Sequence, residues 1–229
     1  MIFRQLFDKE SSTFTYLLGD EATGEAGLVD PVIENVDRDL RLVQELGLKL
    51  TVVLDTHVHA DHVTGAGTLR ERTGARTHFS VRGGPACADV LLADGAFVSV
   101  GDLKLHALAT PGHTDSCMCY VAGDRVFTGD TLLVRGCGRT DFQEGDSAML
   151  WRSVHEKLFT LSDTTYVYPA HDYRGQTCST IGEEKRLNPR LGAAMTVEGF
   201  VELMKNLHLP RPAKFDEAVP ANQACGKRP

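Results

Sequence analysis

Short runs of apolar and β-branched residues, separated by glycine, aspartate and threonine, predict that strands dominate this chain. Residues 101–102 and 123–124 are Gly-Asp pairs between two such runs, and a glycine-containing dipeptide there predicts a tight hairpin. The predicted strands are 14–20, 26–31, 50–54, 77–81, 97–100, 103–108, 118–122, 125–128 and 165–168.

Helical spacing of apolar residues is found in fewer segments. Positions 36, 40, 43 and 46 are apolar, and Gly47 follows, which is a natural end for a helix. The Gly- and Ala-rich segment 83–96 is expected to be a connection. The predicted helices are 36–46, 64–73, 147–158 and 196–207.

The order of these elements favours an α+β or α/β fold in which two sheets pack face to face with helices outside them. Strands dominate each half of the chain, and helices interrupt them without strict alternation. The sequence shows no repeat of fixed period and no clear linker, so we expect a single domain over residues 1–229. Its last part, at about 209–229, contains four prolines and is expected to be an irregular tail.

Composition excludes several classes of partner. The net charge of −7 argues against nucleic acid, because phosphate binding requires a basic surface. No apolar run approaches the roughly 20 residues that span a bilayer, so no membrane association is expected. The first residues lack the apolar segment of a signal peptide, so we expect a cytoplasmic protein. In that reducing compartment the six cysteines are expected to be thiols.

The segment Thr56–His62 carries the strongest chemical signal. It follows the predicted strand 50–54, and if the chain stays extended there, His57, His59 and Asp61 project to one side. Three imidazoles and a carboxylate so close together predict a divalent metal site. The remaining isolated histidines are expected to be solvated or core residues: His78, His106, His155 and His208.

Three further polar residues follow predicted strands, each beside glycine, proline or a small residue. They are His113 after Pro111-Gly112, Asp130 after Gly129, and His171 after Pro169-Ala170. Each alone is compatible with an ordinary turn residue. Their recurrence in one chain with the His57 cluster predicts a shared site.

These motifs together give the chain a resemblance to a known family. Thr-His-x-His-x-Asp-His at 56–62, Pro-Gly-His-Thr, Thr-Gly-Asp and Pro-Ala-His resemble the metallo-β-lactamase superfamily over roughly residues 12–190. The resemblance implies a four-layer αββα sandwich with a metal site at one edge of the sheets. Residues 133–143, His171-Asp172-Tyr173 and 218–222 most resemble the persulfide dioxygenase branch, in a stand-alone form without a rhodanese domain.

The resemblance implies one Fe(II) per chain, bound by His57, His113 and Asp130. Such a site leaves coordination positions for the persulfide sulfur and O2. The implied reaction oxidises glutathione persulfide with O2 to sulfite and glutathione. By the same resemblance, Arg139 and Tyr173 bind glutathione, and a homodimer is expected because this branch often forms dimers.

An alternative reading comes from the related glyoxalase II branch, whose members are binuclear thioesterases that hydrolyse S-lactoylglutathione. The positions that help to hold two metals there are all present here, so counting ligands does not separate the alternatives. We expect these residues instead to orient the ligands of one iron and to hydrogen-bond water. They are His59, Asp61, His62 and His171.

Overall fold

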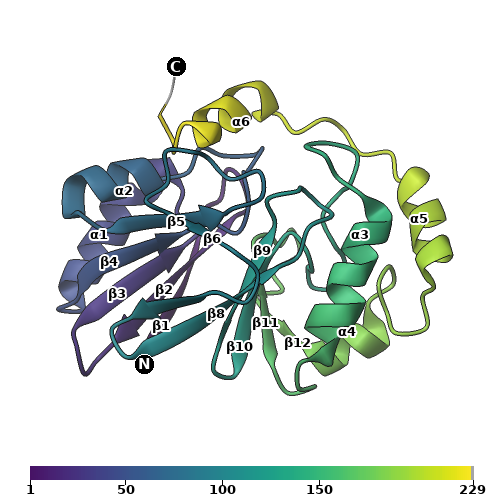
Figure 1. Cartoon of the computed structure of the whole chain (residues 1–229), viewed down its shortest axis with the longest axis horizontal. Coiled ribbons are helices and arrows are strands. Elements are labelled where there is room, and N and C mark those ends of the chain that lie inside the picture. Colours follow the sequence, from purple (N-terminus) through teal and green to yellow (C-terminus); the bar gives the residue numbers. More distant parts are fainter. Residues whose placement is uncertain (228–229) are drawn as a thin grey trace.

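The computed structural model describes residues 1–227 and contains two mixed six-stranded sheets packed face to face (Figure 1). The first sheet has the order β1-β2-β3-β4-β5-β6, and the second has the order β12-β11-β10-β9-β8-β7. The strands of the first sheet are β1 (Ile2–Phe7), β2 (Phe14–Asp20), β3 (Glu25–Val29), β4 (Lys49–Leu54), β5 (Arg76–Ser80) and β6 (Val90–Leu92). Those of the second are β7 (Phe97–Val100), β8 (Leu103–Ala109), β9 (Met118–Ala122), β10 (Arg125–Gly129), β11 (Tyr166–Pro169) and β12 (Ser179–Thr180).

Helices cover the outer face of each sheet, which confirms the four-layer αββα sandwich (Figure 1). In the described chain, two α-helices cover the first sheet and three cover the second, while the last helix lies at one edge of the sandwich (Figure 1). They are α1 (Val36–Glu45), α2 (Ala66–Thr73), α3 (Ser147–Arg152), α4 (Ile181–Leu187), α5 (Val197–Lys205) and α6 (Phe215–Gln223). Among residues 1–227, no helix is both long and apolar enough to cross a membrane.

Alternation along the strands builds three apolar layers from one sequence. Tyr16 and Leu18 of β2 point between the two sheets, whereas Leu17 points outward to α1 and α2. The same switch occurs in β4, where Leu54 faces the other sheet and Val53 faces the helices. Both sides of these central strands are therefore buried, as expected for strands covered on two faces.

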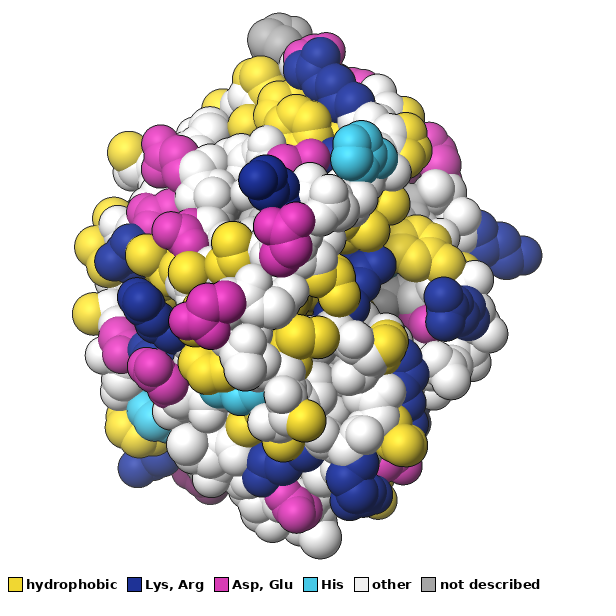
Figure 2. Space-filling model, turned by 90° about the vertical axis from the view of Figure 1, so that its right-hand side faces the viewer, with side chains coloured by type: hydrophobic (Ala, Val, Ile, Leu, Met, Phe, Trp, Pro, Cys, Tyr) yellow, Lys and Arg dark blue, Asp and Glu magenta, His cyan; other side chains and the backbone are white. Residues whose placement is uncertain are grey.

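The helices outside the second sheet expose a surface of mixed charge. Figure 2 shows acidic and basic side chains interspersed on the face that lies at the right of Figure 1, with no broad area of a single sign on that face. A mixed surface of this kind is typical of a solvated protein face.

Several elements depart from the sequence-based expectations. The expected irregular tail at 209–229 is wrong in part, because residues 215–223 form α6 and residues 228–229 lie outside the described structure. The prolines led to the wrong expectation: Pro220 lies inside this helix, although proline lacks a backbone donor and its ring crowds the carbonyl one turn earlier. The connection 83–96 contains the short β6, and α4 was missed although Thr180 caps it by accepting a hydrogen bond from the Glu183 N–H.

The prediction that all six cysteines are thiols is also wrong. Cys87 and Cys225 form a disulfide across a sequence separation of 138 residues. The fold brings the end of α6 over the connection between β5 and β6, and no local pattern could show that contact. The free cysteines of the described chain are Cys117, Cys119, Cys137 and Cys178.

Candidate metal centre

The predicted ligands meet at one edge of the sandwich because the strands that precede them end there. Strands β8, β10 and β11 run in the same direction, since β9 is antiparallel to β8 and to β10, and β11 is parallel to β10. His113, Asp130 and His171 follow these three strands. His57 reaches the same edge from the end of β4 in the other sheet.

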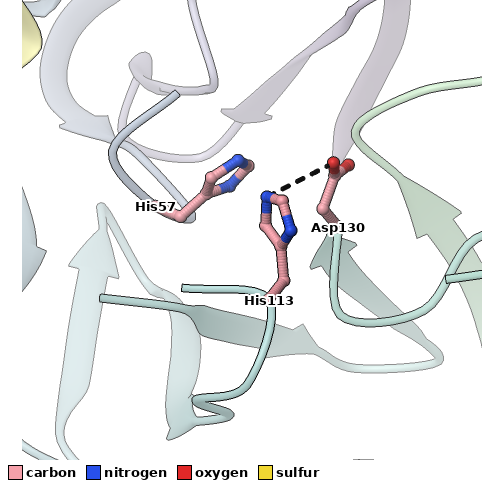
Figure 3. Close-up of side chains that lie close together, drawn as sticks. All are labelled: His57, His113 and Asp130. Carbon is pink, nitrogen blue, oxygen red and sulfur yellow. Dashed lines mark ion pairs between the residues drawn. The ribbon is translucent and has the colours of Figure 1, made fainter. Parts of the chain in front are cut away.

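His57, His113 and Asp130 form a compact group, named here the triad. Their ligand atoms all lie within 4.8 Å of one another. The imidazole Nε2 of His113 lies 3.6 Å from Asp130 Oδ2, and the rings of His57 and His113 lie 4.9 Å apart, centroid to centroid (Figure 3). Two imidazoles and one carboxylate from three separate loops are the donor set of a metal site that keeps positions open for other ligands.

One buried polar atom of the triad has no hydrogen-bond partner in the described chain, which fits a cation-binding site. Asp130 Oδ1 is buried and accepts no hydrogen bond from any described residue. Buried carboxylate oxygens are rarely left in this state. Burial lowers the pKa of His57 well below its ordinary value, with further lowering from His59 and His113, so its imidazole is neutral and able to bind a metal.

Both histidines of the triad are oriented by contacts that the protein makes with their Nδ1 atoms. His113 Nδ1 lies 2.6 Å from the carbonyl oxygen of Arg139, which can only accept, so Nδ1 carries the proton and Nε2 is free. The hydroxyl of Thr56 donates to Asp30 at 2.9 Å and lies 3.0 Å from His57 Nδ1. Partners of this kind fix the tautomer and the ring orientation of metal-binding histidines.

Close backbone approach makes glycine necessary beside the triad. A Cβ on Gly138 would lie 2.8 Å from the His113 ring and 2.7 Å from the carbonyl oxygen of Asp130. Gly129 has a φ of +53°, and a Cβ there would lie 2.5 Å from the Thr56 hydroxyl oxygen. Gly138 therefore lets the loop that carries Arg139 pack directly on the ligands.

A second group, made of His59, Asp61 and His62, lies beside the triad and is named here the adjacent group. Its ligand atoms also lie within 4.8 Å of one another. His62 Nδ1 lies 3.0 Å from Asp61 Oδ2, and the Thr13 hydroxyl donates to the same oxygen at 3.1 Å. His59 Nδ1 and His62 Nε2 are buried and make no hydrogen bond within the described chain, so this group also offers nitrogen atoms that could bind a metal.

His171 connects the two groups. Its Nε2 lies 3.6 Å from Asp61 Oδ2 and 3.7 Å from Asp130 Oδ1. Burial alone would lower the pKa of His171, but the carboxylates of Asp130 and Asp61 raise it above its ordinary value.

The chain was expected to stay extended through His57, His59 and Asp61, with alternate side chains on one side. That expectation is wrong, because the segment 55–63 contains bends instead of a strand. The rings of His57 and His59 nevertheless lie 4.0 Å apart.

Comparison with known proteins identifies the family of this fold and site. A family model described as the metallo-beta-lactamase superfamily matches residues 9–171. The chain belongs to this superfamily. It is 50% identical over 228 residues to the human protein named persulfide dioxygenase ETHE1, mitochondrial, an alignment that covers 99% of this chain and 89% of the human one. The chain therefore belongs to the persulfide dioxygenase branch.

A solved structure of the same branch has nearly the same fold. The crystal structure of ETHE1 from Myxococcus xanthus matches with a TM-score of 0.97 and 60% sequence identity, covering 99% of this chain and 100% of that one. A metallo-β-lactamase from Staphylococcus aureus matches with a TM-score of 0.90 and 27% identity, covering 97% of this chain and 71% of that one. The αββα sandwich expected from the sequence is thereby confirmed.

In this superfamily member, Arg139 and Tyr173 have different surroundings. The guanidinium of Arg139 donates to both carboxylate oxygens of Asp141, at 2.6 and 2.8 Å, and to the carbonyl oxygens of Leu209 and Pro210. Tyr173 is 74% exposed, and its ring stacks on that of His171 with the ring centroids 6.1 Å apart.

Cys137 is buried among apolar side chains, and burial raises the pKa of its thiol to about 11, which fits a packing role.

Sequence reasoning missed the residues that hold the His57–His62 segment. Asp30 accepts from the Thr56 backbone N–H at 2.7 Å, Ser116 accepts through its hydroxyl oxygen from the Val58 N–H, and Gln143 donates to the Val58 carbonyl. Asp30 offered the same signal as the predicted ligands, since it directly follows β3. Ser116 and Gln143 had no such signal, because their contacts are made only in the folded chain.

Proposed function

We propose that this chain is a glutathione-dependent persulfide dioxygenase that uses one Fe(II), held by His57, His113 and Asp130. The balanced reaction takes glutathione persulfide, O2 and water to glutathione and sulfurous acid, which ionises to sulfite. The observation that carries the proposal is the triad, found in a chain that is 50% identical to a protein named persulfide dioxygenase. The homodimer and the cytoplasmic location stay predictions.

The donor set suits iron(II), because a face of two histidines and one carboxylate is typical of non-haem iron oxygenases. Fe(II) bound by the triad would supply open positions for the persulfide sulfur and O2, and the electrons that activate O2. A structural zinc site would instead be a closed tetrahedron rich in cysteine, and the cysteines of the described chain contribute no ligand to this group.

The protein's own contribution is orientation. Thr56 and the Arg139 carbonyl hold the Nδ1 side of His57 and His113, so that each ring presents Nε2 to the centre. Fixed ligands keep both reactants close in one geometry, and such proximity supplies a large part of the rate in many enzymes.

Glutathione binding is proposed for Arg139 and Tyr173. Tyr173 is largely exposed beside His171, so that its side chain is accessible to a peptide group. Arg139 already pairs with Asp141, so a glutathione carboxylate would share or replace that acidic partner. We therefore expect Asp141 to influence substrate affinity as well.

The test is oxygen uptake by freshly purified, iron-loaded protein given glutathione persulfide, with sulfite assayed in the same vessel. Equal amounts of O2 consumed and sulfite formed support the dioxygenase. Hydrolysis of S-lactoylglutathione without oxygen uptake would instead establish the thioesterase. That alternative has one supporting observation, which is the free nitrogen atoms of the adjacent group.

A further inference from the structure

The C-terminal helix α6 lies directly against the segment that carries the metal-binding histidines. Figure 1 shows α6 at the top of the molecule, beside α2 and the loops at that edge. Ala218 and Ala221 of α6 pack on Val63, with Ile33 beside them. This contact is small and apolar, so it does not satisfy the backbone polar groups of the neighbouring segment 59–64.

Asn222 supplies the polar part of the contact. Its side chain is 1% exposed, and its Nδ2 donates to the carbonyl oxygens of His59 and His62 at 2.8 and 2.9 Å. Its Oδ1 accepts from the backbone N–H of Thr64 at 2.8 Å. Both amide hydrogens are therefore used, and the side chain pairs three buried backbone groups of the bent segment 59–64.

A disulfide fixes the end of the same helix. Cys225 lies three residues beyond Asn222 and is buried, while its partner Cys87 is exposed in the connection between β5 and β6. The backbone of Cys225 sits on the first turn of α2, where a Cβ on Gly67 would lie 2.2 Å from the Cys225 carbonyl oxygen. The disulfide thus links covalently the end of α6, which already packs against the segment 59–64, to the connection between β5 and β6.

We infer that Asn222 positions the loop bearing His57, His59 and His62, and that the Cys87–Cys225 disulfide locks Asn222 in place, so that thiol–disulfide state controls metal retention. The switch is reduction by a dithiol, which breaks the S–S bond, transfers two electrons and two protons to give two cysteine thiols, and itself becomes a disulfide. Cys87 is an exposed residue, so a reductant can approach the disulfide from its side. The inference rests on the proposed metal centre.

The disulfide itself is tested by counting thiols in the unfolded protein. Without reductant, four thiols are expected, from the free cysteines at 117, 119, 137 and 178. After reduction, six are expected, because the sequence contains six cysteines. Six thiols before reduction, in protein isolated without reductant, would overturn the lock.

The positioning role is tested by Asn222→Asp, which keeps the shape and the acceptor but replaces the donor group by an oxygen facing two carbonyls. Cobalt(II) is the probe, because its visible spectrum reports coordination geometry and its transfer to a chelator gives a rate of metal loss. We expect an altered spectrum and metal loss about 10- to 100-fold faster, the range for partners that orient ligands. The matched control is Gln223→Glu, the same chemical change at the exposed neighbouring residue.

Equal spectra and equal rates for Asn222→Asp and Gln223→Glu would overturn the positioning role. Circular dichroism and thermal unfolding verify that both variants are folded. If Asn222→Asp does not fold, Asn222→Ser, which shortens the side chain without placing a charge there, is measured in the same way. Wild-type protein that binds no cobalt or iron would remove the metal centre, whereas metal binding unaffected by the variants removes only this inference.

The lock is tested by Cys87→Ser, with Cys178→Ser as the control because Cys178 is an exposed free cysteine. Cys87→Ser, and wild type in a dithiol, are expected to lose cobalt several-fold faster than oxidised wild type. Cys87→Ser should not respond further to the dithiol, and Cys178→Ser should behave as wild type. Identical rates for oxidised and reduced wild type would contradict redox control.

Discussion

The triad and the adjacent group lie side by side at one edge of the sandwich, offer the same kinds of donor atom, and differ in how their carboxylates are used. Asp61 of the adjacent group accepts hydrogen bonds from Thr13 and from His62. Asp130 of the triad has a buried oxygen with no hydrogen-bond partner in residues 1–227. Of the two carboxylates, Asp130 therefore has the greater need for a cation, because its Oδ1 is buried without a hydrogen bond in the described chain and the histidine rings of His113 and His171 lie near its carboxylate.

A complete set of ligand residues therefore does not by itself fix the number of metals. Hydrogen bonds within the protein compete with the metal for the same lone pairs, so a carboxylate with internal partners is a weaker candidate than one without them. His171 lies between Asp61 and Asp130 and bridges the two groups by charge. On this ground we propose the triad, and not the adjacent group, as the site of the single iron.

The largest effect is expected from Asp130→Asn, which removes the charge of the triad and keeps its shape. Metal content should fall far below one equivalent, and turnover should drop by more than about 100-fold, beyond the cost of removing an outer partner. Iron analysis and oxygen uptake measure the two effects. A folded variant that keeps its full iron content would exclude Asp130 as a ligand.

A smaller effect is expected from Asp61→Asn, which tests the adjacent group directly. If Asp61 only orients its neighbours, iron stays at one per chain and turnover falls by about 10- to 100-fold. In a binuclear enzyme the same change would remove a metal ligand and match the loss in Asp130→Asn. Parallel measurement of both variants therefore separates the two readings of the site.

Substitution of Arg139 should act mainly on substrate affinity. Loss of a charge-assisted hydrogen bond costs about 2 kcal/mol, so Arg139→Ala should raise KM for glutathione persulfide roughly thirtyfold. Arg139→Lys keeps the charge without the fork geometry and should fall between Arg139→Ala and wild type. Steady-state kinetics give both parameters, and a loss confined to kcat would argue against a binding role.

The smallest effect is expected from Thr56→Val, which keeps the side-chain shape but removes the hydroxyl beside His57 Nδ1 and acts on the affinity for iron. We expect the affinity for iron to fall about tenfold, because the His57 ring loses one orienting partner but can still coordinate the metal. Competition with a chelator measures the affinity. Ser116→Ala is a useful companion, since its hydroxyl contacts the backbone of the same segment and no ligand ring.

The sequence predicted those parts of the molecule that depend on local pattern. The hairpins at 101–102 and 123–124 were predicted by their Gly-Asp pairs and are confirmed as β7–β8 and β9–β10. The meeting of His57, His113 and Asp130 followed from their places after strands and from the family motifs, and the structure brings them together. The ends of strands that run in the same direction meet at one edge of a sheet, so a residue's place directly after a strand predicted that it lies at the site.

Features built from distant contacts could not be predicted in this way. The Cys87–Cys225 disulfide joins residues 138 positions apart, and Asn222 reaches the metal-binding loop from the last helix. The proline-rich composition of the C-terminal stretch concealed that helix. Arg139 was predicted to bind glutathione, which stays a prediction, whereas the contacts of its guanidinium with Asp141 and two backbone carbonyls are visible only in the folded chain.

We propose that one iron, held by the triad, carries the oxidation. The most direct measurement is titration of Fe(II) into metal-free protein under anaerobic conditions, with oxygen uptake from glutathione persulfide measured after each addition. The account predicts that activity rises linearly and reaches its plateau at one iron per chain, with sulfite formed in equal amount to the oxygen consumed. A plateau only at two metals per chain, or full metal loading without oxygen uptake, would contradict it.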